Sequence, residues 1–106
     1  MTFVLLYTVF PDRVVADQIL EELVRDQLVV CTNILGDGVS MYLWKGLFEK
    51  TMEIYCLLKT TPDRVDKVYA FFQQKHPYEA FPLFKISAES MHEPYNSWVK
   101  DEMKLL

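Results

Sequence analysis

Cysteine and glycine are both scarce in this chain. Its 106 residues include two cysteines, Cys31 and Cys56, and three glycines. Two cysteines so far apart do not suit a disulfide scaffold or a Cys-x-x-Cys centre, so we expect two reduced thiols in a cytoplasmic protein. No linker, repeat or low-complexity stretch interrupts the sequence, and its length suits one domain over residues 1–106.

Long apolar runs and clusters of basic residues are missing as well. No run approaches the ~20 apolar residues of a membrane span, and the first residues lack the basic region and cleavage site of a secretory signal. The net charge is −4, and the eleven basic residues are scattered. Because nucleic-acid affinity rests on neutralising phosphates, we expect no nucleic-acid partner, and we expect no insertion into a membrane.

Apolar periodicity predicts a strand–helix–strand–strand–helix–strand order with one further helix. Strands are expected over 3–9, over 28–45 with a bend at the glycines of 36–38, over 51–60 and over 81–87. Helices are expected over 12–26, over 61–76 and from 94 onward. This order indicates the α+β class and a ferredoxin-like fold with a long central hairpin and an extra C-terminal helix.

Local signals support the expected helix ends. Asp12 offers an N-cap, and Thr61-Pro62 is a strong helix start. Pro77 ends the second helix because it disfavours helical geometry at the residue before it. Lys45-Gly46 is the expected turn of the hairpin. The last helix is predicted to bury one side, made of Tyr95, Trp98, Val99, Met103 and Leu106.

One face of the predicted sheet is unusually apolar. A ferredoxin-like fold places both main helices on one sheet face, yet the first strand is apolar on both faces. The hairpin also carries a row of large side chains, Tyr42, Trp44, Tyr55 and Leu57. An uncovered face of this kind associates or aggregates, so we expect a homo-oligomer. The alternative is that the C-terminal helix alone covers it.

Five short motifs, in order along nearly the whole chain, resemble the signature of the CutA family. They are Cys31-Thr32-Asn33-Ile34, Ser40-x-Tyr42-x-Trp44-x-Gly46, Glu53-x-x-x-Leu57-x-Lys59-Thr60-Thr61, His76-Pro77-Tyr78-Glu79 and Tyr95-x-Ser97-Trp98. The resemblance implies a homotrimer whose sheets pack together and whose long hairpins reach neighbouring subunits. It also implies a part in tolerance of divalent cations, with copper the usual ion, and a design shared with the PII signalling proteins.

The candidate metal ligands are His76, which the resemblance suggests, and Cys31, which the symmetry of a trimer would bring together in three copies. An imidazole suits Cu(II), and a cysteine near a threefold axis becomes a cluster of three. Some copper-linked bacterial relatives carry Cys and His where this chain has Tyr7 and Lys75, and the family usually has Pro-Glu where this chain has Phe81-Pro82. The competing interpretation is structural: His76 would cap the second helix, and Cys31, like Cys56, would pack as a small hydrophobe. The isolated His92 is expected on the surface.

The other motif residues divide between a cleft and an interface. Four residues could line a cleft between subunits, with Lys59 holding an anion, or form salt bridges between subunits: Glu53, Lys59, Tyr78 and Glu79. Four aromatic residues are expected at the trimer interface, because Trp and Tyr are enriched at buried interface centres: Tyr42, Trp44, Tyr55 and Trp98.

Two other functions known for this fold require residues that this chain does not have. Acylphosphatases share the order and size, but residues 9–13 offer one arginine after a proline and no glycine to cradle an anion. No Ser-His-Asp order, glycine-rich loop or His-Glu-x-x-His motif is present. An RNA-recognition module would need basic and aromatic residues that 51–55 does not supply. We therefore expect no enzyme, and either a copper-handling trimer or a PII-like sensor or scaffold.

Overall fold

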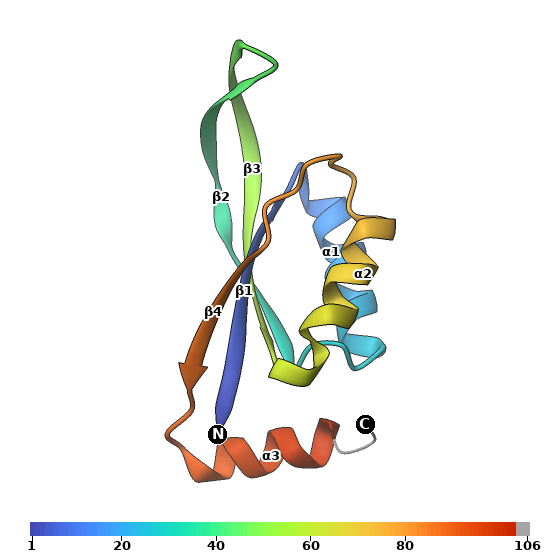
Figure 1. Cartoon of the computed structure of the whole chain (residues 1–106), viewed down its shortest axis with the longest axis vertical. Coiled ribbons are helices and arrows are strands. Elements are labelled where there is room, and N and C mark those ends of the chain that lie inside the picture. Colours follow the sequence, from blue (N-terminus) through green and yellow to red (C-terminus); the bar gives the residue numbers. More distant parts are fainter. Residues whose placement is uncertain (104–106) are drawn as a thin grey trace.

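The computed structural model describes residues 1–103 and has the expected α+β architecture (Figure 1). Its elements are β1 (Thr2–Phe10), α1 (Arg13–Arg25), β2 (Cys31–Trp44), β3 (Leu47–Thr60), a 3₁₀ turn (Pro62–Arg64), α2 (Val65–Lys75), β4 (Phe84–Glu89) and α3 (Glu93–Met103). The strands form one antiparallel sheet in the order β2-β3-β1-β4. With α1 and α2 on one side of the sheet, this is the ferredoxin-like topology that the sequence predicts.

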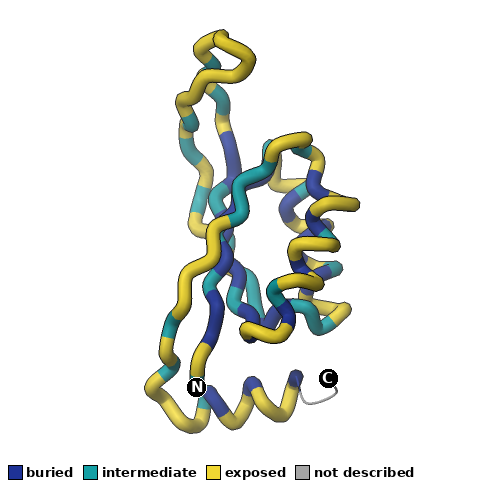
Figure 2. Tube along the Cα trace, in the orientation of Figure 1, coloured by how far each residue is buried: buried dark blue, intermediate teal, exposed yellow. Residues whose placement is uncertain are grey.

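The main core lies between the sheet and the two helices. Along β1, Val4, Leu6 and Phe10 face α1 and α2, and they pack against residues such as Leu23 and Phe72. Figure 2 shows the buried residues concentrated along β1 and the inner sides of these helices. The Asp12 side chain accepts a hydrogen bond from the Val15 amide at 2.9 Å, which confirms the expected N-cap of α1.

The β2–β3 hairpin is longer than predicted. Its turn is Lys45-Gly46, with φ angles of 52° and 81°, as a tight two-residue turn requires. Because Trp44 pairs directly with Leu47, β3 begins at Leu47 rather than at residue 51. A bulge after Ile34 places Gly36 at a φ of 150°. The hairpin extends beyond the body and helps to give the chain its 47 Å length.

Two further strands have boundaries that differ from the prediction. The second strand begins at Cys31 and not at residue 28, because Gln27 turns the chain with a φ of 58°. The last strand is 84–89 and not 81–87. Proline has no amide hydrogen for a ladder, and the Pro82 carbonyl accepts a hydrogen bond from the Thr8 hydroxyl at 2.7 Å. Phe81 turns inward to stack on His76, so pairing with β1 starts only at Phe84.

The C-terminal helix α3 packs against one end of the sheet. Its buried residues are Asn96, Val99 and Met103, and Val99 and Met103 form a second small core with Phe3 and Val30. Trp98, expected on the buried side, is instead 45% exposed, and Leu106 lies outside the described residues.

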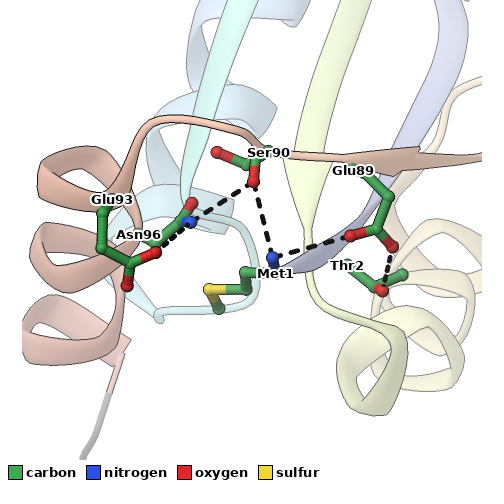
Figure 3. A network of polar contacts seen from close by, with 6 residues as sticks. All are labelled: Met1, Thr2, Glu89, Ser90, Glu93 and Asn96. Carbon is green, nitrogen blue, oxygen red and sulfur yellow. Dashed lines mark hydrogen bonds and ion pairs between the residues drawn. The ribbon is translucent and has the colours of Figure 1, made fainter.

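A polar network fixes the start of α3 (Figure 3). The Asn96 amide donates to the Ser90 carbonyl and to Glu93, both at 3.3 Å. The same carbonyl lies 3.5 Å from the Met1 amino group. The carboxylate of Glu89 lies 3.6 Å from that amino group and also accepts from the Thr2 hydroxyl. These contacts connect β1, β4 and α3.

The sheet face opposite α1 and α2 stays open. Cross-strand pairing places Tyr7, Phe84 and Leu57 in one row of this face, and Leu5 and Ile86 in the next. Phe84 is 62% exposed and Ile86 51%. The alternative in which α3 covers this face is wrong, because α3 reaches Phe3 at its end and leaves these rows uncovered. We call these five residues the open face.

Arg64 holds the far end of α3, and its loss should loosen that helix. Buried Arg64 donates to the Met103 carbonyl at 2.8 Å and to the Thr61 hydroxyl at 2.6 Å. In Arg64→Met we expect the free energy of unfolding to fall by about 2 kcal/mol, because two hydrogen bonds from a charged group are lost. Chemical denaturation at fixed chain concentration measures it, and α3 amides should exchange faster with solvent.

The matched control is Gln27→Ala. The half-buried Gln27 donates a solvent-exposed hydrogen bond to another carbonyl of α3, that of Glu102, at 3.1 Å, and we expect a loss of less than about 1 kcal/mol. If both variants lose the same free energy of unfolding, buried Arg64 contributes no more to holding α3 than Gln27 does, which contradicts the prediction.

Candidate functional site

A pocket of about 440 Å³ opens between the hairpin and the 77–82 segment that follows α2. Aromatic and acidic side chains form much of its lining: Tyr42, Trp44, Glu49, Glu53, Tyr78 and Glu79. Apolar residues complete it: Val9, Pro77, Ala80 and Pro82. The segment crosses in front of β1 on its way to β4 (Figure 1). The pocket therefore combines residues far apart in sequence that the sheet register brings together.

Glu53 is the buried acid of this pocket. Glu53 is only 6% exposed. One of its carboxylate oxygens accepts a hydrogen bond from the Tyr78 hydroxyl at 2.6 Å. Burial, followed by this hydrogen bond and the nearby charge, raises the pKa of Tyr78 far above its usual value. Tyr78 therefore remains a neutral donor at physiological pH, and Glu53 accepts its hydrogen bond.

The pocket is acidic. Glu49, Glu53 and Glu79 contribute carboxylates, and no lysine or arginine is among the lining residues. Within residues 1–103, no basic group lies within 4 Å of the Glu53 carboxylate, and its Oε1 has no hydrogen-bond partner. In the hairpin turn, the Lys45 ammonium lies 5.7 Å from the Trp44 ring centroid. Such a field attracts cations and repels anions.

His76 supports the pocket wall from behind. Its Nε2 lies 2.9 Å from the Val9 carbonyl, and its Nδ1 accepts from the Tyr78 amide at 3.1 Å. Since a carbonyl only accepts and an amide only donates, the ring is neutral with its proton on Nε2. The ring is stacked between Phe10 and Phe81, with both centroid distances 4.9 Å. Burial lowers the pKa of His76, so the neutral form is retained.

This geometry does not suit the metal site suggested for His76 and Cys31. Both ring nitrogens of His76 are already hydrogen-bonded, so a metal would have to displace one bond. Cys31 lies opposite Lys59 at the other end of the hairpin. Across residues 1–103, no three His, Cys, Asp or Glu side chains converge on a position for a metal ion. His76 is the C-cap residue of α2 by position, but its ring bonds to the Val9 carbonyl of β1 and to the Tyr78 amide rather than to carbonyls of the helix, as the capping interpretation had it.

Lys59 is the cleft candidate that does not reach the pocket. Its ammonium lies 6.0 Å from the Tyr95 ring centroid, beside Cys31. Burial, and then the neighbouring Cys31 thiol, raises the pKa of Tyr95. The other cysteine, Cys56, is fully buried, and burial raises the pKa of its thiol to about 11, which leaves it unreactive.

The expected interface aromatics lie in different places. Tyr42 and Trp44 line the pocket. Tyr55 lies on β3 within the hairpin, and its ring would come within 2.8 Å of a Cβ added to Gly38. Trp98 stands on α3, with its ring centroid 5.6 Å from that of Tyr95. Sequence reasoning missed Glu49, which pairs with Tyr42; counting outward in both directions from the Lys45-Gly46 turn would have found it.

Comparison with known proteins identifies the family. The model of the family described as "CutA1 divalent ion tolerance protein" matches residues 4–102, almost the whole chain. The chain belongs to the CutA1 family. The CutA1 family is not known as a family of enzymes. No helix within residues 1–103 of this CutA1 chain is long and apolar enough to cross a membrane.

Individual CutA1 relatives agree with this assignment. The "Divalent-cation tolerance protein CutA" of Pyrococcus horikoshii is 29% identical over 101 residues, covering 95% of this chain and 98% of that protein. Human "Protein CutA" is 31% identical over 90 residues, and the chain spans about half of its length, with a coverage of 50%. The CutA1 crystal structure from Ehrlichia chaffeensis is 30% identical, has a TM-score of 0.87, and covers 95% of this chain and 94% of its own.

Proposed function

We propose that the chain acts as a non-catalytic homotrimer in tolerance of divalent cations, with copper(II) or a similar ion attracted to the Glu53 pocket. The single observation that carries this is the buried Glu53 carboxylate, which has no basic partner among the described residues. Family membership supports the cation class, because relatives are named for divalent-cation tolerance. We also place the protein in the cytoplasm, supported by its two free thiols.

Trimer formation is supported by the open face. Exposed Phe84 and Ile86 continue the apolar rows of β1 and β3 on the part of this face that α3, as described to residue 103, leaves uncovered. Several further apolar side chains are exposed along the hairpin, among them Met41, Leu43 and Phe48. Contiguous apolar area of this kind is typical of an association surface. In a trimer, each open face would be buried by a neighbouring copy.

A second candidate function is sensing of a small molecule, in the manner of PII proteins. The aromatic walls of Tyr42, Trp44 and Tyr78 favour it, since metal ions gain little from such walls whereas small-molecule sites use them. The acidic lining changes the expected ligand, because three carboxylates disfavour the anion that the sequence suggested.

Copper(II) titration by calorimetry tests the first function. We expect uptake by the wild-type protein, and at least about tenfold weaker binding by Glu53→Gln, because removing one buried charge costs about 1.4 kcal/mol or more. Glu21→Gln is the control, since Glu21 is exposed and paired with Arg25 at 3.1 Å. Uptake that is unchanged in Glu53→Gln would remove the pocket from the proposal.

A further inference from the structure

The pocket walls fit an organic cation better than a hydrated metal ion. A divalent metal ion prefers several oxygen ligands and gives up its water reluctantly. Here Val9, Pro77, Ala80 and Pro82 present apolar surface instead. An ammonium or guanidinium group attached to a hydrocarbon chain can bury that chain against such residues while its charge meets the carboxylates.

The aromatic residues add a specific attraction for such a group. Tyr42, Trp44 and Tyr78 line the same pocket as Glu53. Aromatic faces attract cations through their quadrupole, and tryptophan does so best. Lys45 already places an ammonium 5.7 Å from the Trp44 centroid, so this ring accepts a cation within the chain itself. The volume of about 440 Å³ is that of a small-molecule site.

Glu53 provides the charge at a fixed position. It is buried, held through one oxygen by Tyr78, and its other oxygen has no partner within residues 1–103. That free oxygen is not among the fully buried polar atoms, so it is open to the pocket and can accept a hydrogen bond from a ligand. Tyr78 is in turn held by the His76 ring, which accepts from its amide. The anionic group is therefore preorganised to receive a donor from the pocket.

We propose that this pocket binds a small organic cation, an alkylammonium or alkylguanidinium ion, whose charged head pairs with Glu53 and lies against Trp44. This deepens the second candidate function and rests on the pocket being a ligand site. Glu49 and Glu79 add negative charge to the lining.

Matched probes test the charge requirement. Butylguanidinium, butylammonium, neutral 1-butanol and anionic butyrate are titrated by calorimetry into the full chain, with Trp44 fluorescence followed in a Trp98→Phe background. We expect both cations to bind at least about tenfold more tightly than butanol, and butyrate not to bind. If butanol binds as tightly as the two cations, the proposal is overturned.

Variants locate the site. We expect Glu53→Gln to weaken cation binding at least about tenfold and Trp44→Leu about three- to tenfold. The control Asp37→Asn removes an exposed carboxylate from the same hairpin and should leave binding unchanged. Equal losses in Asp37→Asn and Glu53→Gln would show non-specific attraction and overturn the assignment.

Comparing copper(II) with the organic cations separates the proposed metal binding from the proposed binding of an organic cation. Organic cations that bind while copper(II) does not would support this inference and end the metal-binding function. If copper(II) binds and Glu53→Gln weakens its binding while the organic cations do not bind, only this inference is overturned. If neither binds and Glu53→Gln instead dissociates the trimer, a basic side chain of a second copy already neutralises Glu53, and the inference is again overturned.

Discussion

Phe84→Glu is expected to convert the proposed homotrimer into single chains. Phe84 is 62% exposed in one chain and lies in the same row as Tyr7 and Leu57. In a trimer packed through the open face, the new carboxylate would be buried without a partner at each contact. Such burial costs several kcal/mol per charge. At micromolar concentration, light scattering should therefore report a mass near the 12.5 kDa of one chain.

The matched control for Phe84→Glu is Val14→Glu. Val14 is also an exposed apolar residue, but it lies in the first turn of α1, on the other side of the sheet. A carboxylate at a helix start is favoured by the helix dipole, so we expect an unchanged mass. Circular dichroism should show that both variants remain folded. A folded Phe84→Glu protein that keeps the wild-type mass would exclude the open face as the interface.

His76 should make stability depend on pH. Burial lowers its pKa in the folded chain below the ordinary 6.5, so below pH 6.5 the unfolded chain binds a proton that the folded chain refuses. The contribution of neutral His76 to the free energy of unfolding is therefore complete above about pH 6.5. It should fall as the pH drops from there toward the lowered pKa, with a slope of up to ~1.4 kcal/mol per pH unit.

The variants His76→Gln and His92→Gln separate the two histidines. His76→Gln should lose about 3 kcal/mol at neutral pH, because the stacked ring and two hydrogen bonds are removed, and its stability should change little between pH 7.5 and 5.5. His92 is exposed, so His92→Gln should keep the wild-type pH dependence. Urea denaturation at several pH values and one chain concentration measures this. A pH slope that survives in His76→Gln would refute the assignment to this ring.

Elements with strong local signals could be predicted from the sequence. The N-cap at Asp12 and the Lys45-Gly46 turn depend on contacts within a few residues, so pattern and chemistry sufficed. The start of β4 could not be predicted, because it depends on Phe81 turning inward to His76 and on the Thr8 hydroxyl reaching the Pro82 carbonyl. These are long-range contacts that an alternating apolar pattern does not encode.

The candidate site shows the same division. The acidic and aromatic residues Glu53, Tyr78, Tyr42 and Trp44 stand out in the sequence, yet only the fold brings them into one pocket. Lys59 stands out equally, but it lies six residues further along β3 and contacts Tyr95 instead. The hydrogen-bonding of both His76 nitrogens was also beyond the sequence, because it depends on the Val9 carbonyl of β1.

The central claim is that this CutA1 chain works as a homotrimer, and native mass spectrometry of the unmodified protein tests it most directly. We expect one dominant species with three times the 12.5 kDa mass of the chain, stable on dilution to low micromolar concentration. A dominant single chain at that concentration would contradict it, because the exposed Phe84 and Ile86 of the open face would then have no cover.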